Sequence, residues 1–210
     1  MELIPADAPP GAVYKLLTGA VVPRPIGWVS TVDAKGQPNL APFSFFNAVC
    51  SRPPTLLFCP SVRSTDANPK DTLNNLRQTG EFVVNIVTQE LAEAMNKTAT
   101  ELPPEMDEFS YAGLSAAPSA VVAPPRVAES PVHFECRLNQ IIQIGDGGLG
   151  AGWIVIGEIV HLHVDERVLL PNYKIDTAAL QPIGRLAGPH YARINETFEL
   201  FREPSQVQPR

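Results

Sequence analysis

The chain has 210 residues, of which 44% are hydrophobic and 18% are charged, a balance typical of globular rather than disordered proteins. The formal net charge is −6 and lysines and arginines form no run, which argues against a nucleic-acid partner. Three cysteines without a C-x-x-C pair indicate neither a disulfide framework nor a cysteine zinc site. Because no apolar run approaches bilayer length and the first residues lack a signal-peptide pattern, we expect one cytoplasmic domain, residues 1–210, without a membrane partner.

In chain order, short helical turns are expected near 11–18, and a strand over 20–31. The next apolar run, 39–49, contains Pro42 and polar residues where a buried strand should carry neither. A proline cannot donate to a sheet ladder, so this strand is predicted to lie at an edge or to be interrupted. Backbone groups released in this way would suit a flat heteroaromatic ligand, which is our first hypothesis about function.

A strand at 55–60 is followed by a polar loop, 60–72, that leads into a helix predicted over 70–79. Asp71 is the expected N-cap of this helix and Gly80 its stop. This loop carries several hydroxyls and two cations, and it leads to the unsatisfied N–H groups at the start of the helix. Together these groups favour an anion site suited to a terminal phosphate. The alternative interpretation is a solvated, well-capped loop without a ligand.

Further strands are predicted at 81–88, 132–144 and 153–164, with a second helix at 89–98. Many strands and few helices, without regular βα alternation, predict a mainly β fold built as a closed or partly closed antiparallel barrel. Residues 145–150 satisfy G-x-G-x-x-G literally, but a strand-like segment follows where a dinucleotide site needs a helix. We therefore interpret these glycines as a hairpin connection.

His161 and His163 stand two apart on the last long strand, so their side chains share a face. Sequence indicates no third ligand, and we assign no metal site there. We interpret His133 as a structural residue. The segment 184–193 places cations and aromatics in a loop of small residues, which favours either a cover over a site or a strap on the barrel surface.

Several of these segments resemble the flavin reductase-like family, which has the FMN-binding split-barrel fold. The resemblance covers about residues 12–203 and rests on the order of PRPIGWVST (23–31), NLAPFSFFN (39–47), PP-x-L-x-F (53–58), KDT-x-x-N (70–75), GEFVVNIV (80–87), IGEIVHLHVD (156–165) and RLAGPHYAR (185–193). The chain is most similar to the flavoredoxin-type branch, which includes reductase components of two-component monooxygenases. Ala187 departs from the pattern, since relatives often carry a second glycine there.

The resemblance implies an antiparallel, Greek-key-like split β-barrel, a homodimer, and one FMN per subunit near the subunit interface. It assigns the isoalloxazine ring to the strand around Pro42, and the phosphate to the 61–72 loop. His190 and Tyr191 are placed by the exposed ring face, as candidates near the nicotinamide. The cofactor-binding residues implied are Arg24, Ile26, Asn39, Ala41, Pro42, Phe43, Ser44, Ser61, Arg63, Lys70, Asp71 and Thr72.

The activity implied is hydride transfer from NADH or NADPH to FMN, with reduced flavin or electrons passed to a monooxygenase or another acceptor protein. The flavin supplies the redox chemistry, which explains why the sequence shows no conspicuous acid–base dyad. Two alternatives stay open at this point. One is an electron-transfer flavoprotein that NAD(P)H does not reduce, and the other is a non-enzymatic split-barrel module that binds another ligand, such as haem.

Overall fold

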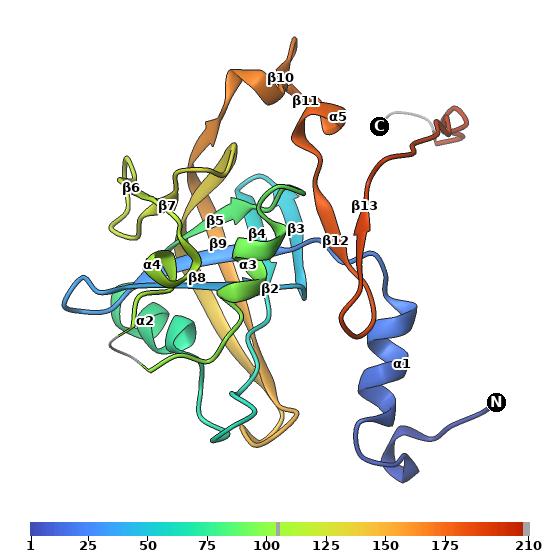
Figure 1. The fold of residues 1–210 in the computed structure, drawn as a ribbon. Helices are drawn as coiled ribbons and strands as arrows, with labels where there is room; N and C mark the ends of the chain where they lie inside the picture. Colours follow the sequence, from blue (N-terminus) through green and yellow to red (C-terminus); the bar gives the residue numbers. More distant parts are fainter. Residues whose placement is uncertain (104–105, 208–210) are drawn as a thin grey trace.

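The computed structural model describes residues 1–103 and 106–207, and Figure 1 shows how their elements are arranged. The helices are η1 (Pro5–Asp7), α1 (Ala12–Ala20), α2 (Asp71–Thr79), α3 (Ala92–Lys97), α4 (Glu108–Ala112), η2 (Glu166–Val168) and α5 (Thr177–Leu180). The strands of the main sheet are β1 (Gly27–Val32), β2 (Pro38–Phe43), β3 (Phe46–Ser51), β4 (Pro54–Phe58), β5 (Glu81–Ile86), β8 (Val132–Ile144) and β9 (Gly152–Val164). Short strands form three separate two-stranded ladders: β6 (Ala116–Ala117) with β7 (Arg126–Val127), β10 (Leu169–Leu170) with β11 (Lys174–Ile175), and β12 (Ile183–Arg185) with β13 (Tyr191–Arg193).

The main sheet is antiparallel, and its strand order is β2-β1-β5-β8-β9-β4-β3. Its two outermost strands, β2 and β3, are consecutive in the chain and are separated by two residues, 44–45. So short a connection brings the two edges together, and the sheet must roll up without a ladder between them. The Phe43 and Phe58 rings, from opposite ends of the strand order, lie 4.9 Å apart across the closure. The predicted partly closed barrel is confirmed.

Strand β2 lies at an open edge of this sheet and pairs only with β1 among the main-sheet strands, with Pro42 opposite Trp28. Both expectations from Pro42 are therefore met, because the predicted run 39–49 is also divided into β2 and β3 at residues 44–45. Bonding to β1 uses alternate residues of an antiparallel strand, so the groups at Leu40 and Pro42 point to the free edge. The Leu40 N–H is taken by the Glu108 carboxylate at 3.1 Å, and Pro42 has none.

Two apolar clusters hold the barrel together. The larger one fills the barrel and includes Phe58, Phe82, Leu73 and Trp153. The second lies on the other side of β1 and β2, where Trp28 and Leu40 pack against Met95 of α3 and Phe109 of α4. Trp28 is fully buried, and its Nε1 donates to Thr98 Oγ1 at 2.9 Å. This second cluster fixes the α3–α4 segment beside the free edge of β2.

The helices were only partly predicted. Helix α2 matches the expected 70–79 and ends at Gly80, whose φ of 67° is in the left-handed region that glycine favours. The expected N-cap was wrong by one position: Lys70 is the N-cap residue and Asp71 is the first residue of the helix, where its charge still complements the helix dipole. Helices α4 and α5 were not predicted, because they are only 5 and 4 residues long.

The glycine-rich segment 145–150 connects β8 to β9 as a hairpin, and the dinucleotide interpretation stays rejected. Gly145, Gly147 and Gly150 have φ values between 86° and 89°, which explains why glycine stands at these positions. Strand β1 is shorter than the predicted 20–31, since residues 21–26 run as irregular chain from α1 to β1. In the described ranges, no helix combines the length and the apolar character needed to cross a bilayer.

Candidate functional site

Two adjoining hollows lie along β2 and share Ala99 as a lining residue. The wide end has a volume of about 380 Å³, within the range of small-molecule sites, and is lined by Tyr14, Thr18, Arg24, Ile26, Pro42, Ser44, Met95, Ala99, Arg185, Leu186, Gly188 and Tyr191. The narrow end, of about 30 Å³, is lined by Asn39, Ala41, Arg63, Lys70, Asp71, Thr72, Thr98, Ala99, Thr100, Glu101, Leu102 and Glu108. Of the residues predicted for the ring, Arg24, Ile26, Pro42 and Ser44 line the wide end. Asn39 and Ala41, also predicted for the ring, line the narrow end with the residues predicted for the phosphate.

At the wide end, Arg24 acts as a clasp between three segments. Its Nη1 donates to the carbonyls of Thr18 (2.7 Å) and Val21 (2.9 Å), and its Nη2 donates to the Leu186 carbonyl at 3.0 Å. Its Nε lies 3.4 Å from Ser44 Oγ. Arg24 is 6% exposed as a whole residue, and its guanidinium is hydrogen-bonded to these carbonyls. Arg24 borders the space as predicted, and its contacts make it a positioning residue for the walls.

The late segment supplies one wall of the wide end through the β12–β13 hairpin. Arg24 joins it to the barrel by an isolated bridge with Arg185. The Arg185 guanidinium lies over the Tyr191 ring, 4.6 Å from its centre, and Nη1 donates to the Tyr191 hydroxyl. That hydroxyl donates to Asn96 Oδ1 at 3.2 Å, which ties the hairpin to α3. The segment therefore lines the wide end and is also attached to the barrel, which agrees with both roles left open by its sequence.

At the narrow end, a hydrogen bond joins β2 to the first turn of α2. Asn39 Nδ2 donates to Thr72 Oγ1 at 3.1 Å, and both residues are buried. Because Thr72 accepts this bond, its own O–H remains a donor. Lys70 lies at the N-cap position beside it, and in the described chain it forms no ion pair. A hydroxyl, an ammonium and helix N–H groups therefore converge on this end.

Arg63 is less available than the sequence suggested, because two carboxylates hold it. Its Nη2 lies 3.0 Å from Asp66 Oδ2 and its Nη1 lies 3.3 Å from Asp71 Oδ2. The Asn68 backbone N–H, together with Arg63, lowers the pKa of Asp66 to about 2, so this carboxylate stays ionised near neutral pH. Lys70 is the better placed of the two predicted cations for a ligand anion.

Two further acids border the narrow end. Glu101 accepts from the Ser64 N–H at 3.0 Å and from Thr65 Oγ1 at 2.5 Å, which pins the 60–72 loop. Burial raises the pKa of Glu108 to about 7, against the opposing effect of the Leu40 N–H that it accepts. This carboxyl is half neutral near physiological pH, which lowers its repulsion toward an anion beside Lys70.

Three predicted residues do not line either space. Phe43 is 6% exposed, and its ring packs into the barrel core against Phe58, so its side chain cannot reach a ligand. Ser61 is exposed and forms a bridge with Gly152 instead. The His190 side chain is exposed, and its backbone closes the hairpin by accepting from the Leu186 N–H at 2.9 Å. The side chains of these three residues lie outside both spaces, while the other predicted residues line one of them.

Sequence reasoning missed the contributions of α1 and of the α3–α4 segment. Tyr14 and Thr18 line the wide end, while Thr98, Glu101 and Glu108 line the narrow end. No local motif marks them. Thr18 of α1 meets the wide end through Arg24, and the α3–α4 segment meets β2 through the packing of Trp28 against α3 and α4. Arg185 and Gly188 also line the wide end, and both belong to the RLAGPHYAR segment, whose cation and glycine are their signal in the sequence.

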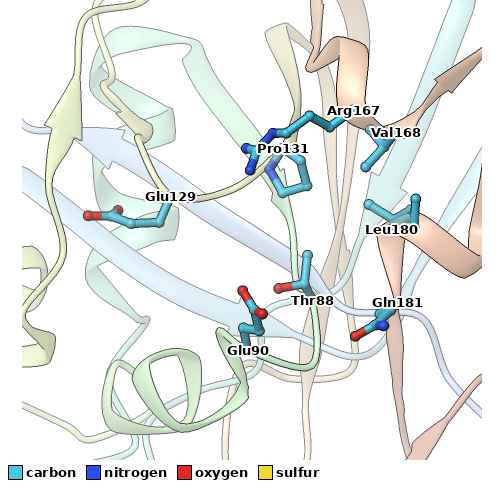
Figure 2. Close-up of a pocket in the computed structure, with 9 residues that line it drawn as sticks. Thr88, Glu90, Glu129, Pro131, Arg167, Val168, Leu180 and Gln181 are labelled. Carbon is cyan, nitrogen blue, oxygen red and sulfur yellow. The ribbon is translucent and has the colours of Figure 1, made fainter.

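A separate hollow of about 330 Å³ lies at the other end of β12. Figure 2 shows Thr88, Glu90 and Gln181 on one side of it and Arg167 on the other. Arg167 is paired with Asp165 at 2.6 Å, and two glutamates, Glu90 and Glu129, give the space an acidic character. None of the residues predicted for the cofactor lines this hollow.

The groove along β2 fits a flavin mononucleotide in the character of its donors. The wide end combines apolar and aromatic walls with the free carbonyl edge of β2, as a planar ring requires. The narrow end offers Lys70, Thr72 and the N-terminus of α2 to a phosphate. Ala41 lines the narrow end and also packs against the larger core cluster.

The comparisons with known proteins agree with this fold. Residues 19–178 match the flavin reductase-like domain. A relative from Halalkalibacterium halodurans, whose function is uncharacterised, is 44% identical over 203 residues, which are 96% of each chain.

Solved structures give the same result. Nitrilotriacetate monooxygenase component B from Bacillus cereus has a TM-score of 0.89 at 36% identity, over 95% of this chain and 98% of that one. The 2-nitrobenzoate 2-nitroreductase NbaA of Pseudomonas fluorescens has a TM-score of 0.85 at 30% identity, over 99% and 100%. A Shewanella frigidimarina protein described as a flavin reductase with a split-barrel domain shares the fold, with a TM-score of 0.82 at 21% identity, over 97% and 100%. The chain belongs to the flavin reductase-like family and has its split-barrel fold.

Proposed function

We propose that this protein binds FMN along β2 and transfers hydride to it from NADH or NADPH. The observation that carries the proposal is the sorting of the groove into a wide, aromatic-walled end and a narrow end with Lys70 and Thr72. A ring and a phosphate need those two environments in that order. Membership of the flavin reductase-like family supports the same assignment.

When bound, the flavin supplies the hydride-accepting chemistry. The chain's own residues bind and orient it. Lys70 and Thr72 hold the phosphate, Ala41 and Pro42 set the plane against which the ring lies, and Arg24 fixes the walls around it. Tyr191 lines the wide end, where a nicotinamide would stack on the exposed face of the ring.

The test is an anaerobic titration of FMN-loaded protein with NADH and, separately, NADPH. Bleaching of the flavin absorption band by either donor is the expected result. Purified protein that carries no flavin, does not bind added FMN and does not oxidise NAD(P)H in its presence would contradict the proposal. Parallel titration with FAD decides between the two flavins, and retention of the yellow colour through gel filtration distinguishes a tightly bound group from a released substrate.

The electron-transfer alternative predicts a different outcome of the same experiment. A protein that binds FMN tightly but is bleached only very slowly by both nicotinamides, and rapidly by a chemical reductant, is a carrier reduced by another protein. A haem-binding module would show a Soret band instead of flavin bands.

The electron acceptor follows from similarity to the reductase component of a two-component system. Because the Bacillus cereus structure is a monooxygenase component B, we assign a flavin-dependent monooxygenase as the first partner to test. The similarity to a nitroreductase makes a nitroaromatic compound the second acceptor to test. Faster NADH consumption on addition of either acceptor, with coupled product formation, is the readout.

Helix α1 supports assembly as a homodimer. Figure 1 shows it projecting from the barrel, and Thr18 is its only buried residue. Val13, Leu16 and Leu17 on this helix are each between 39% and 48% exposed. An apolar hollow beside it is lined by Leu17, Val21, Pro23, Arg24, Pro25, Ser44, Phe45, Phe46, Asn47, Leu57 and Cys59. A second copy covering this surface would also close the wide end, and light scattering should give twice the chain mass.

We also assign the whole of residues 1–210 to a single domain. The β12–β13 hairpin lies beyond the 19–178 family match, yet Arg185 and Tyr191 line the same wide end as Arg24. Limited proteolysis should therefore leave a core that includes this hairpin.

A further inference from the structure

Three of the four histidines in the chain gather around one buried glutamate, away from the groove. His133 and Glu135 are two apart on β8, and His161 and His163 are two apart on β9. The antiparallel register pairs Glu135 with His161 and His133 with His163. Residues two apart on a strand share a face, so all four side chains project from the same side of the β8–β9 ribbon.

Glu135, His161 and His163 lie close enough to share one ion. Their ligand atoms are all within 4.8 Å of one another, and the His163 Nε2 lies 2.5 Å from Glu135 Oε1. Two donors bound to one tetrahedral zinc ion lie about 3.4 Å apart, a spacing between these two values. Two imidazoles and one carboxylate form the protein ligand set of zinc sites that keep a fourth position for water.

The glutamate is held in the state and orientation that a ligand needs. Glu135 is 0% exposed, and its two oxygens accept from the backbone N–H groups of Ala120 and Val121, each at 2.7 Å. These donors fix the carboxylate plane, as outer hydrogen bonds do around metal ligands. They also connect the segment that precedes β7 to the long β8–β9 ribbon.

Unpartnered ring nitrogens are the observation that an ordinary ion pair does not explain. A Glu135–His163 pair accounts for those two side chains alone. His161 Nδ1 is buried without a hydrogen-bond partner in the described part of the chain, and so is Nδ1 of His133, a residue 4% exposed. His133 Nε2 contacts the Val127 carbonyl at 2.8 Å. Buried polar atoms are rarely left unsatisfied, and a ligand beside His161 would satisfy one of them.

We propose that Glu135, His161 and His163 bind one divalent transition-metal ion of the zinc class, with water in the remaining position. The ion clips β8 to β9 and, through Glu135, to the segment at Ala120–Val121. Sequence alone offered only His161 and His163, and the fold supplies the third ligand from β8. None of the three residues lines the groove along β2, so the proposal does not rest on flavin binding.

The test uses the full chain without a histidine tag, stripped with a chelator and titrated with Co²⁺. The expected result is the absorption of four-coordinate cobalt, saturating at one ion per chain and abolished by added Zn²⁺. Zn²⁺ should also raise the thermal midpoint of the parent. His161→Ala should weaken binding at least tenfold and remove this thermal shift.

His190→Ala is the matched control, because it removes the one histidine outside the cluster and should leave cobalt binding unchanged. Circular dichroism and FMN content report whether His161→Ala is folded, and His163→Gln gives a second ligand deletion. Absence of a cobalt spectrum and of any zinc-dependent thermal shift in the parent overturns the site. Full affinity in folded His161→Ala and His163→Gln variants overturns it as well.

Discussion

The two ends of the groove are built by different means. At the wide end, the buried cation Arg24 donates its hydrogen bonds to backbone carbonyls. Selection of a ligand there depends on the apolar walls and on the free edge of β2. At the narrow end, charge of both signs is concentrated: Lys70 and Arg63 face Asp71, Glu101 and Glu108. This difference suggests a division of roles. The shape of the wide end should decide whether a flavin ring binds, and the charges of the narrow end should decide whether a phosphate binds and in which ionisation state. Riboflavin, which lacks the phosphate, separates the two contributions.

The largest effect is expected at Arg24. Arg24→Ala leaves the carbonyls of Thr18, Val21 and Leu186 without their donor. We expect a loss of about 3–5 kcal/mol in the free energy of unfolding, measured by urea titration, and loss of binding for both FMN and riboflavin. Arg24→Lys should recover part of this stability. A variant as stable as the parent would show that the wide end does not depend on this clasp.

Ala41→Leu should come next, because it adds bulk at a residue that lines the narrow end and that the proposed binding mode places against the ring. We expect both flavins to bind about 100-fold more weakly, by fluorescence quenching, since a larger side chain occupies ring space. The thermal midpoint, recorded in parallel, controls for changes in core packing. Unchanged flavin affinity in a folded Ala41→Leu variant would show that β2 is an irregular edge strand and does not bind the ring.

Lys70→Met sharpens the comparison by acting on one end only. Loss of a charge-assisted hydrogen bond of about 1.5–3 kcal/mol should weaken FMN about 10- to 100-fold and leave riboflavin unchanged. Lys174→Met, an exposed lysine of β11, is the control for net charge. Equal losses for FMN and riboflavin would mean that Lys70 acts on structure rather than on the phosphate.

The smallest effect is a pH dependence at Glu108. Its pKa is raised from 4.5 to about 7, so the carboxyl ionises around neutral pH, and its charge then faces the phosphate. We expect FMN affinity to fall about threefold or more over pH 7.0–8.5, where the phosphate is already dianionic. Riboflavin affinity should stay flat, and Glu108→Gln should abolish the FMN trend.

The Glu108 carboxyl should also make the free energy of unfolding depend on pH. Because its folded pKa is raised above the unfolded one, its stabilising contribution is fully present below about pH 4.5 and is lost as pH rises through about 7. Relative to Glu108→Gln, the parent should therefore lose unfolding free energy between pH 5 and pH 8. If the free energies of unfolding of the parent and of Glu108→Gln depended on pH in the same way, the pKa of Glu108 would not be raised by burial.

The barrel was predictable because its signals are local. Pro42 within an apolar run required an edge or a break, and the glycines at 145–150 followed by a β run required a hairpin. The side chains of Phe43, Ser61 and His190 lie outside the groove, because a motif fixes where the backbone passes and leaves side-chain direction open. Glu101 and Glu108 were missed since they reach the groove only by packing that joins distant segments.

The most direct test of the central claim is a crystal structure of the protein with FMN. We expect the phosphate within hydrogen-bond distance of Lys70 and Thr72 and the ring against Pro42 at the wide end. A flavin bound in the hollow lined by Glu90, Glu129 and Arg167, or anywhere else outside the β2 groove, would contradict the account.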